Sequence, residues 1–279
     1  MRERLLMEQR MRLSLEAGHF EVWFQPRVDL RSRRIIGAEG LVRWRDPEQG
    51  LVSPGVFIPL AERSPLIHKL GRTVIEQVIG HARRWHAQGL DFGKLSMNVA
   101  TPQIERGNLV GELRDILADV EVPRHMLEIE VTESLFMADA ERAKRMLGEI
   151  RELGLSVAID DFGTGYSSLA YLKTLPVNHL KIDRAFVRDL PEQASDAAIV
   201  RAILAMSQSL GFHVTAEGIE TAAQLEFLAD AGCVFGQGFL FHKPMPAAEF
   251  EALLKLTTPA PAAAPALPML PPRAGLAGA

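Results

Sequence analysis

The sequence has little of the material that several classes of protein require. Its 279 residues include one cysteine, Cys233, which excludes an intramolecular disulfide and is typical of a reducing compartment. The net charge of −4 offers no basic surface for a nucleic-acid duplex, although it is compatible with a small phosphate ligand. No apolar run reaches the ~18–20 residues that cross a membrane, and the N-terminus mixes Arg and Glu, unlike a signal peptide. We therefore expect this segment to be cytoplasmic, whether or not a longer parent protein is anchored to a membrane.

The composition is that of an ordinary globular protein, and three segments can be separated within it. Residues 1–17 carry apolar side chains at i, i+4 and i+8 from Met7, which predicts an amphipathic helix. Residues 257–279 are rich in proline and alanine and have almost no charge, which predicts a disordered tail. Residues 18–256 remain as one large domain.

Strand-like and helix-like stretches alternate along this domain. Strands are predicted at 20–28, 35–44, 94–99, 126–131, 155–160, 178–182, 212–216 and 234–241, and helices between Val56 and Gly89 and at 102–118, 138–153, 167–174, 196–210, 221–231 and 246–256. Eight strands alternating with helices predict an α/β fold, a closed (β/α)8 TIM-like barrel, with an open doubly wound sheet as the alternative. Only about five residues separate the first two strands, too few for a parallel crossover, so the first strand should be antiparallel.

Two adjacent carboxylates, Asp160 and Asp161, end an apolar run and precede a turn at Gly163. Neighbouring side chains on a strand point to opposite faces, so both can reach one site only if the strand ends there. Paired buried carboxylates stay charged only beside a cation. Taken alone, the pair has a simpler interpretation, a helix N-cap followed by a solvated turn.

Polar residues recur at the C-terminal ends of the predicted strands, where barrel enzymes place their functional groups. Each could cap a helix, but the placement repeats on consecutive strands: Glu39 and Arg43, Asn98, Glu130 with Glu133, Asp160 with Asp161, Lys181 with Asp183, Glu217 with Glu220, and Gln237. The carboxylates at such a barrel mouth need cations to stay ionised, and oxygen ligands suit Mg²⁺ or Mn²⁺. Their number indicates two ions that share a bridging carboxylate, the arrangement that hydrolyses phosphate esters. Lys181 is placed to orient a water or hold a phosphate oxygen, and Arg43 to contact a phosphate.

These residues resemble the EAL-domain family of cyclic di-GMP phosphodiesterases over roughly residues 8–256. The resemblance rests on motifs that occur in the family's order: Gln25-Pro26, Gly37-Ala38-Glu39-Gly40-Leu41-Val42-Arg43-Trp44, Phe57-Ile58-Pro59-Leu60-Ala61-Glu62, Glu130-Val131-Thr132-Glu133-Ser134, Asp160 through Leu169, Lys181-Ile182-Asp183, Glu217-Gly218-Ile219-Glu220 and Gly236-Gln237-Gly238. It implies a modified (β/α)8 barrel with an antiparallel first strand, two Mg²⁺ or Mn²⁺ ions, and hydrolysis of cyclic di-GMP to linear pGpG.

The resemblance also implies a role for each matched residue. The implied metal ligands are Glu39, Asn98, Glu130, Asp160, Asp161 and Glu217, and the catalytic set is Lys181, which orients the water nucleophile, with Glu217, Asp160 and Asp161. Substrate contacts are implied for Gln25, Arg43, Asp183 and Gln237. Glu133 and Glu220 are expected to anchor the loop 162–168, which similar domains use in dimerisation and regulation.

A homodimer is expected from the same resemblance, and so is an upstream sensory or GGDEF domain. Helix 1–17 would then be the end of a linker, and a helix that merely closes the barrel floor is the alternative.

Two positions depart from the family pattern. The signature alanine is Gly40, which should point outward if Glu39 points inward, so the change weakens the strand by about 1 kcal/mol and removes no ligand. The family's serine two residues after Asn98 is Ala100, which removes a hydroxyl that can support the metal site. A catalytically silent receptor for cyclic di-GMP and a scaffold without ligand are the alternative functions, but the complete set of acidic residues favours the enzyme.

Overall fold

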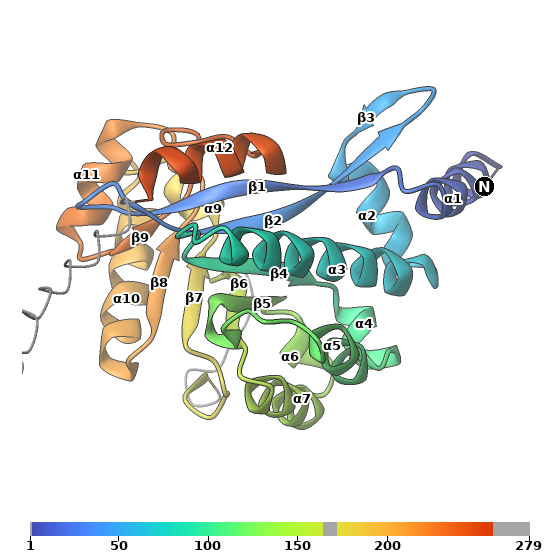
Figure 1. Cartoon of the computed structure of the whole chain (residues 1–279). Coiled ribbons are helices and arrows are strands. Elements are labelled where there is room, and N and C mark those ends of the chain that lie inside the picture. Colours follow the sequence, from blue (N-terminus) through green and yellow to red (C-terminus); the bar gives the residue numbers. More distant parts are fainter. Residues whose placement is uncertain (1, 164–171, 259–279) are drawn as a thin grey trace, which may run out of the picture.

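A closed barrel of strands forms the centre of the molecule (Figure 1). The computed structural model describes residues 2–163 and 172–258. Neighbouring strands pair from β1 through β9, β8, β7, β6, β5 and β4 to β2, which pairs with β1 and closes the ring. This confirms the predicted (β/α)8 fold, with the strands β1 (Phe20–Asp29), β2 (Ile35–Asp46), β4 (Lys94–Val99), β5 (Leu127–Thr132), β6 (Ser156–Phe162), β7 (His179–Ile182), β8 (His213–Ala216) and β9 (Phe235–Gly236).

β1 runs against both of its barrel neighbours, as the short connection to β2 predicts. Trp23 lies opposite Leu41 in the antiparallel β1–β2 pair, and Val28 lies opposite Gly236 in the antiparallel β1–β9 pair. The other neighbouring pairs of the ring are parallel. Because parallel strands end at the same rim, their C-terminal residues are brought together there.

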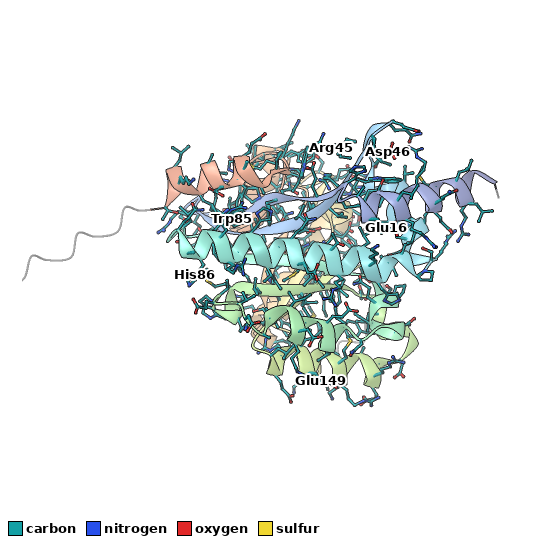
Figure 2. The ribbon with its side chains drawn as sticks, turned by 45° about the vertical axis from the view of Figure 1, so that its right-hand side comes forward. Glu16, Arg45, Asp46, Trp85, His86 and Glu149 are labelled. Atoms are coloured by element: carbon teal, nitrogen blue, oxygen red, sulfur yellow. The ribbon has the colours of Figure 1, made fainter. Side chains whose placement is uncertain are left out.

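Helices cover the outside of the barrel (Figure 1). They include α3 (Leu66–Ala87), α5 (Leu109–Leu117), α7 (Ala140–Glu152), α10 (Ala194–Leu210), α11 (Ala222–Asp230) and α12 (Ala247–Thr257). Trp85 of α3 is completely buried, with its ring centroid 5.0 Å from that of Phe24 and 5.2 Å from that of Phe250. The next residue, His86, is exposed, so the helix shows the amphipathic pattern expected of a barrel helix (Figure 2).

A second apolar cluster lies where α1 (Arg2–Glu16) and α2 (Pro54–Glu62) meet the end of β2. Met11 of α1 is completely buried in it. The rings of Phe20 and Trp44 stack at 5.4 Å, and Phe57 lies edge-on to both. α1 therefore packs on the barrel domain through the apolar face that its sequence predicts.

Several elements differ from the sequence predictions. The helix predicted at 102–118 is two helices, α4 (Thr101–Arg106) and α5, because Asn108 Oδ1 accepts a hydrogen bond from Gly111 N and starts α5 anew. A short strand, β3 (Gly50–Val52), pairs with β2 and was not predicted.

The strand predicted at 234–241 is also wrong in length, because β9 ends at Gly236. Gln237 follows the strand, and its backbone N–H donates to Ala216 O while its C=O accepts from Ile219 N. Gln237 thus bonds to the last residue of β8 and to the segment that follows β8, and the regular ladder ends here.

The remaining short elements are η1 (Arg124–Met126), α6 (Leu135–Ala138), α9 (Arg184–Val187) and β10 (Met245–Pro246). The predicted helix 167–174 lies mostly outside the described residues, as does the predicted tail from residue 259 onward. Among the described residues we found no helix with both the length and the apolarity of a membrane span.

Candidate active site

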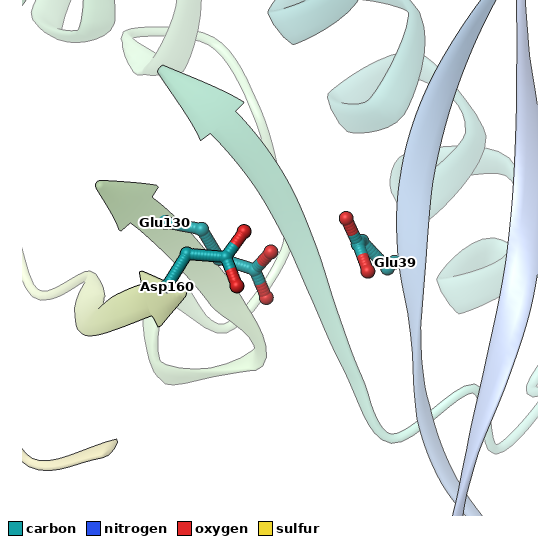
Figure 3. A group of neighbouring side chains, drawn as sticks. All are labelled: Glu39, Glu130 and Asp160. Carbon is teal, nitrogen blue, oxygen red and sulfur yellow. The ribbon is translucent and has the colours of Figure 1, made fainter. Parts of the chain in front are cut away.

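Carboxylates from three strands meet inside the C-terminal rim of the barrel (Figure 3). Glu39 lies on β2, Glu130 on β5 and Asp160 on β6, and the three side chains point toward a common space. One carboxylate oxygen of each lies within 4.8 Å of the others. Asp160, Asp161 and Glu217 form a second group that meets the same distance limit. Asp160 belongs to both groups, so the two groups share one carboxylate.

Asp160 and Asp161 line the same cavity because the backbone turns between them. Asp161 has a φ of 54°, outside the conformation of a regular strand, and the β6–β7 register shifts between Ile159 and Phe162. The strand continues to Phe162, so the expectation that it ends at the carboxylate pair is wrong. The pair converges through an irregularity inside β6, a costly conformation that recurs at functional sites.

Lys181 of β7 lies in the middle of the acidic groups. Its Nζ is 2.7 Å from Glu130 Oε2, 2.7 Å from Glu217 Oε1, 3.1 Å from Asp160 Oδ1 and 3.2 Å from Glu39 Oε2. The side chain is completely buried. This ammonium balances only part of the surrounding negative charge, so a bound cation would find a favourable potential here.

Neutral amides fix the Glu39 carboxylate. Asn98 Nδ2 donates to Glu39 Oε1 at 2.6 Å, and Gln237 Nε2 donates to Glu39 Oε2 at 2.8 Å. Gln237 Nε2 also lies 3.0 Å from Gln25 Oε1, and Gln25 Nε2 donates to the backbone oxygen of His242 at 3.1 Å. The structure thus brings four of the predicted site residues into one hydrogen-bonded group.

Burial and mutual repulsion change the proton affinity of the carboxyls. Burial raises the pKa of Glu130 to about 8, because the Lys181 ammonium is offset by the Glu39 and Asp160 carboxylates. Burial, a hydrogen bond with Asp183 and the Asp160 charge raise the pKa of Asp161 to about 7.

Glu217 and Glu39 shift in opposite directions. Burial raises the pKa of Glu217 well above its usual value. Burial would also raise the pKa of Glu39, but the Lys181 ammonium and the Gln237 and Asn98 amides outweigh it, so that pKa is lowered. Protons and metal cations therefore compete for this cluster.

The residues present fit a bound metal ion. Glu130 Oε1 is buried and accepts no hydrogen bond from any residue in the described ranges, so it keeps ligand capacity. Both carboxylate groups offer only oxygen atoms. Such ligands suit hard cations rather than zinc. The acidic cluster could therefore bind a metal.

A cavity of about 270 Å³ opens beside the cluster. Asn98, Asp160 and Asp161 line it, and apolar residues of α2 and α3 such as Ile58 and Leu70 line it as well. Arg43 also lines the cavity, and its guanidinium lies 5.4 Å from the centroid of the Trp23 ring. A wall that combines apolar surface, carboxylates and one guanidinium suits a ligand with a flat ring and a phosphate.

Three predicted residues lie at the edge of the cluster. Asp183 accepts a hydrogen bond from Ala185 N at 2.6 Å and so caps α9. Glu133 Oε2 accepts from Gly163 N at 3.1 Å, immediately before the undescribed residues 164–171. Glu220 is exposed, and its carboxylate forms no ion pair with a residue that the structure describes. The loop-anchoring roles of Glu133 and Glu220 stay predictions.

The two positions that depart from the family pattern, Gly40 and Ala100, both lie among described residues, and their contacts can be named. Gly40 faces outward, as predicted, because a Cβ there would lie 2.7 Å from Val78 Cγ2 on α3. Ala100 precedes α4, and its backbone N–H donates to Gln103 Oε1 at 3.0 Å.

A second polar layer under the acidic cluster was missed by the sequence analysis. It contains Arg27, Glu128 and His179, all buried. Strand alternation could have found it, because each lies two residues from a predicted site residue and faces the same side of its strand.

Comparison with known proteins gives consistent matches. The family model described as EAL domain matches residues 8–244. The cyclic di-GMP phosphodiesterase NbdA of Pseudomonas aeruginosa is 40% identical over 253 residues, covering 91% of this chain and 32% of NbdA. The bifunctional diguanylate cyclase/cyclic di-GMP phosphodiesterase MucR of the same bacterium is 40% identical over 250 residues, covering 90% of this chain and 36% of MucR.

A solved structure titled PaMucR phosphodiesterase, c-di-GMP complex, superimposes with a TM-score of 0.85 at 40% identity. The superposition covers 88% of this chain and 99% of the solved MucR chain. The chain spans about a third of the length of the two curated relatives.

Proposed function

The chain belongs to the EAL domain family, and on that premise we propose that it is a two-metal phosphodiesterase that hydrolyses cyclic di-GMP to linear pGpG. The observation that carries the proposal is the pair of carboxylate groups that share Asp160. Enzymes that cleave phosphate esters often hold two ions through a bridging carboxylate. The two ions stabilise the attacking oxygen and the leaving oxygen of an in-line displacement.

Each side chain has a proposed role that follows from its position. Mg²⁺ or Mn²⁺ would be held by Glu39, Asn98, Glu130, Asp160, Asp161 and Glu217. When bound, such ions acidify water and neutralise charge on the phosphate. Lys181 donates from Nζ to the attacking water and holds it in line with the phosphorus.

The cavity determines how the nucleotide would lie. Its volume of about 270 Å³ is small for a whole dinucleotide, so we propose that one guanosine half enters it and the other lies across the open rim. Arg43 contacts the guanosine half that enters the cavity. Gln25, Gln237 and Asp183 contact the sugar–phosphate ring of the dinucleotide near the bond that is cleaved.

The competing function is a receptor that binds cyclic di-GMP without cleaving it. Ala100 is the observation that favours it, because it lacks the hydroxyl that the family usually has close to Asn98. Conversion of cyclic di-GMP, followed by chromatography in Mg²⁺, tests the enzyme directly. Thermal stability in Ca²⁺, which in this family supports binding without turnover, tests the receptor. Strong stabilisation in Ca²⁺ without product in Mg²⁺ would favour the receptor.

We also propose that the chain acts as a homodimer and follows a sensory or GGDEF domain. Both rest on the family resemblance. Light scattering of the purified chain measures the first, and a monomeric mass at micromolar concentration would contradict it.

A further inference from the structure

A layer of polar side chains fills the barrel directly below the acidic cluster. The interior of a (β/α)8 barrel is usually filled by branched apolar side chains. Here Arg27 of β1, Glu128 of β5, His179 of β7 and Thr215 of β8 face inward, and each is at most 6% exposed. A buried polar layer of this kind is costly and calls for a purpose beyond packing.

Arg27 reaches past β2 to residues of β4 and β5. Its Nη1 donates to Glu128 Oε1 at 2.7 Å, and its Nη2 donates to the backbone oxygen of Lys94 at 3.1 Å. Gly37 lies opposite Arg27 on β2, and a Cβ there would clash with Lys94 O, the acceptor of this bond, and lie 3.2 Å from Arg27 Nη2. The guanidinium is therefore held in one place by the barrel wall.

Glu128 is held just as firmly from its other side. His179 Nδ1 lies 3.1 Å from Glu128 Oε2, and His179 Nε2 lies 2.8 Å from Thr215 Oγ1. Lys94 Nζ lies 3.5 Å from Glu128 Oε2. Neither member of the Arg27–Glu128 pair has freedom to rotate away without breaking several contacts.

The same guanidinium touches the acidic cluster above. Arg27 Nη1 lies 3.8 Å from Glu130 Oε1, whereas Lys181 Nζ binds the other oxygen, Glu130 Oε2, at 2.7 Å. A cation thus stands on each side of this carboxylate. Lys181 stands among the acidic groups and must share them with any bound ion, but Arg27 stands below them and keeps its contact.

We propose that Arg27 is a positioning residue for metal binding: from the layer below, it holds the Glu130 carboxylate in the orientation that binds the cation. The proposal rests on the proposed two-metal function. Arg27 supplies positive charge and direction, and Glu128 and the backbone oxygen of Lys94 fix Arg27 itself. Without the guanidinium, Glu130 Oε1 would lose the cation that faces it, and the carboxylate would be free to turn away from the metal site.

The test is Mg²⁺ affinity, measured by titration calorimetry on the metal-free full chain. Arg27→Met should weaken Mg²⁺ binding by about 10–100-fold, the range found when a group that orients a metal ligand is removed. Arg27→Lys, which keeps the charge, should recover part of the loss. In saturating Mg²⁺, the KM for cyclic di-GMP should change little, because Arg27 touches no substrate.

Two further variants separate positioning from general stability. Thr215→Val breaks only the far end of the layer, so it should lower stability while leaving Mg²⁺ affinity at the wild-type value. Arg27→Met combined with Glu128→Gln avoids leaving a buried charge unpaired, and it should fold and still bind Mg²⁺ weakly. Wild-type affinity in this double variant would overturn the role of Arg27. A wild-type chain that binds no Mg²⁺ at all would instead overturn the proposed function.

Discussion

Lys181 and Glu130 form an ion pair at 2.7 Å in which both side chains are completely buried. Lys181 also contacts the carboxyls of Glu39, Asp160 and Glu217, and removing the cation from a buried group of this kind typically costs about 3–5 kcal/mol, because negative charge is left uncompensated. Lys181→Met should therefore lower the free energy of unfolding of the metal-free chain by roughly that amount. Mg²⁺ should restore much of the loss, because a bound cation takes over the charge compensation.

Urea unfolding in EDTA and in Mg²⁺ measures both effects. Lys255→Met is the control, because Lys255 pairs with Glu251 on the surface and its removal should cost less than about 1 kcal/mol. Equal destabilisation by Lys181→Met with and without Mg²⁺ would contradict this role of the ion pair.

The pKa values of Glu130, about 8, and Asp161, about 7, predict an unusual pH dependence of stability. Above pH 6.5 the unfolded carboxyls have lost their protons, whereas the folded chain still holds some. The free energy of unfolding should then fall as pH rises, by up to about 1.4 kcal/mol per pH unit for each proton held. Histidines with a lowered pKa, such as His81 at about 4, act in the opposite sense until the unfolded imidazoles lose their protons between about pH 6.5 and 7.5, so the decline should be clearest in the upper part of the range.

Chemical unfolding at several values between pH 6.5 and 8 checks this prediction. The decline should appear in EDTA, disappear in saturating Mg²⁺, and be smaller in Glu130→Gln. A metal-free stability that rises across this window would count against the raised carboxyl pKa values.

Gly40 of β2 packs closely against the side chain of Val78 on α3. A Cβ at Gly40 would lie 2.7 Å from Val78 Cγ2, and a valine cannot move that atom cheaply. Gly40→Ala should therefore lose about 1–3 kcal/mol of stability, which reverses the expectation from the sequence that glycine weakens the strand at this position. Adding Val78→Ala should recover part of this loss.

The matched control is Gly80→Ala on α3, the helix that also carries Val78. A Cβ at Gly80 would meet nothing within 4 Å, so this change should raise stability by about 0.5–1 kcal/mol. Thermal or urea unfolding compares the variants, and a gain from Gly40→Ala alone would show that the close fit is not real.

Ala100 stands at the N-cap of α4 with extended backbone and no side-chain acceptor. Gln103 Oε1 already accepts the Ala100 N–H, which is half of a capping box. Ala100→Ser would supply the other half and should add about 0.5–1 kcal/mol of stability. A serine hydroxyl that caps α4 is not available to the metal site, so Mg²⁺ affinity should stay unchanged; a rise in affinity would show that the hydroxyl supports the metal site, as the receptor alternative assumes. Ala100→Val, which adds bulk without an acceptor, should give no gain, and a gain equal to that of serine would argue against capping.

The strand order and the acidic residues at the rim could be predicted because they follow from simple rules. Alternating strands and helices give parallel neighbours, and parallel neighbours end at one rim. Glu130 and Asp160, which lie near the C-terminal ends of neighbouring parallel strands, therefore had to come together, and Glu39 joins them from the interior of β2. The antiparallel direction of β1 could be predicted because the connection between β1 and β2 is too short for a parallel crossover.

Other features depend on contacts that a pattern does not contain. The left-handed φ of Asp161 is set by how β6 pairs with β7, and no local signal marks it. The contacts of Arg27 with Lys94 and Glu128 join β1 to β4 and β5, which lie far from it in the sequence, and no motif marks them. β9 is short because the backbone beyond Gly236 contacts the segment after β8, where Ile219 N donates a hydrogen bond to Gln237 O, and such a tertiary contact leaves no local pattern.

Asp161 gives the most direct test of the two-metal account, because it belongs to one carboxylate group and Asp160 joins that group to the other. Purified chain and the Asp161→Asn variant would be incubated with cyclic di-GMP and Mg²⁺ or Mn²⁺, and the nucleotides resolved by chromatography. The account predicts pGpG from the wild-type chain and its loss in the variant, with unchanged circular dichroism. Tight binding of cyclic di-GMP without any pGpG from the wild-type chain would contradict it.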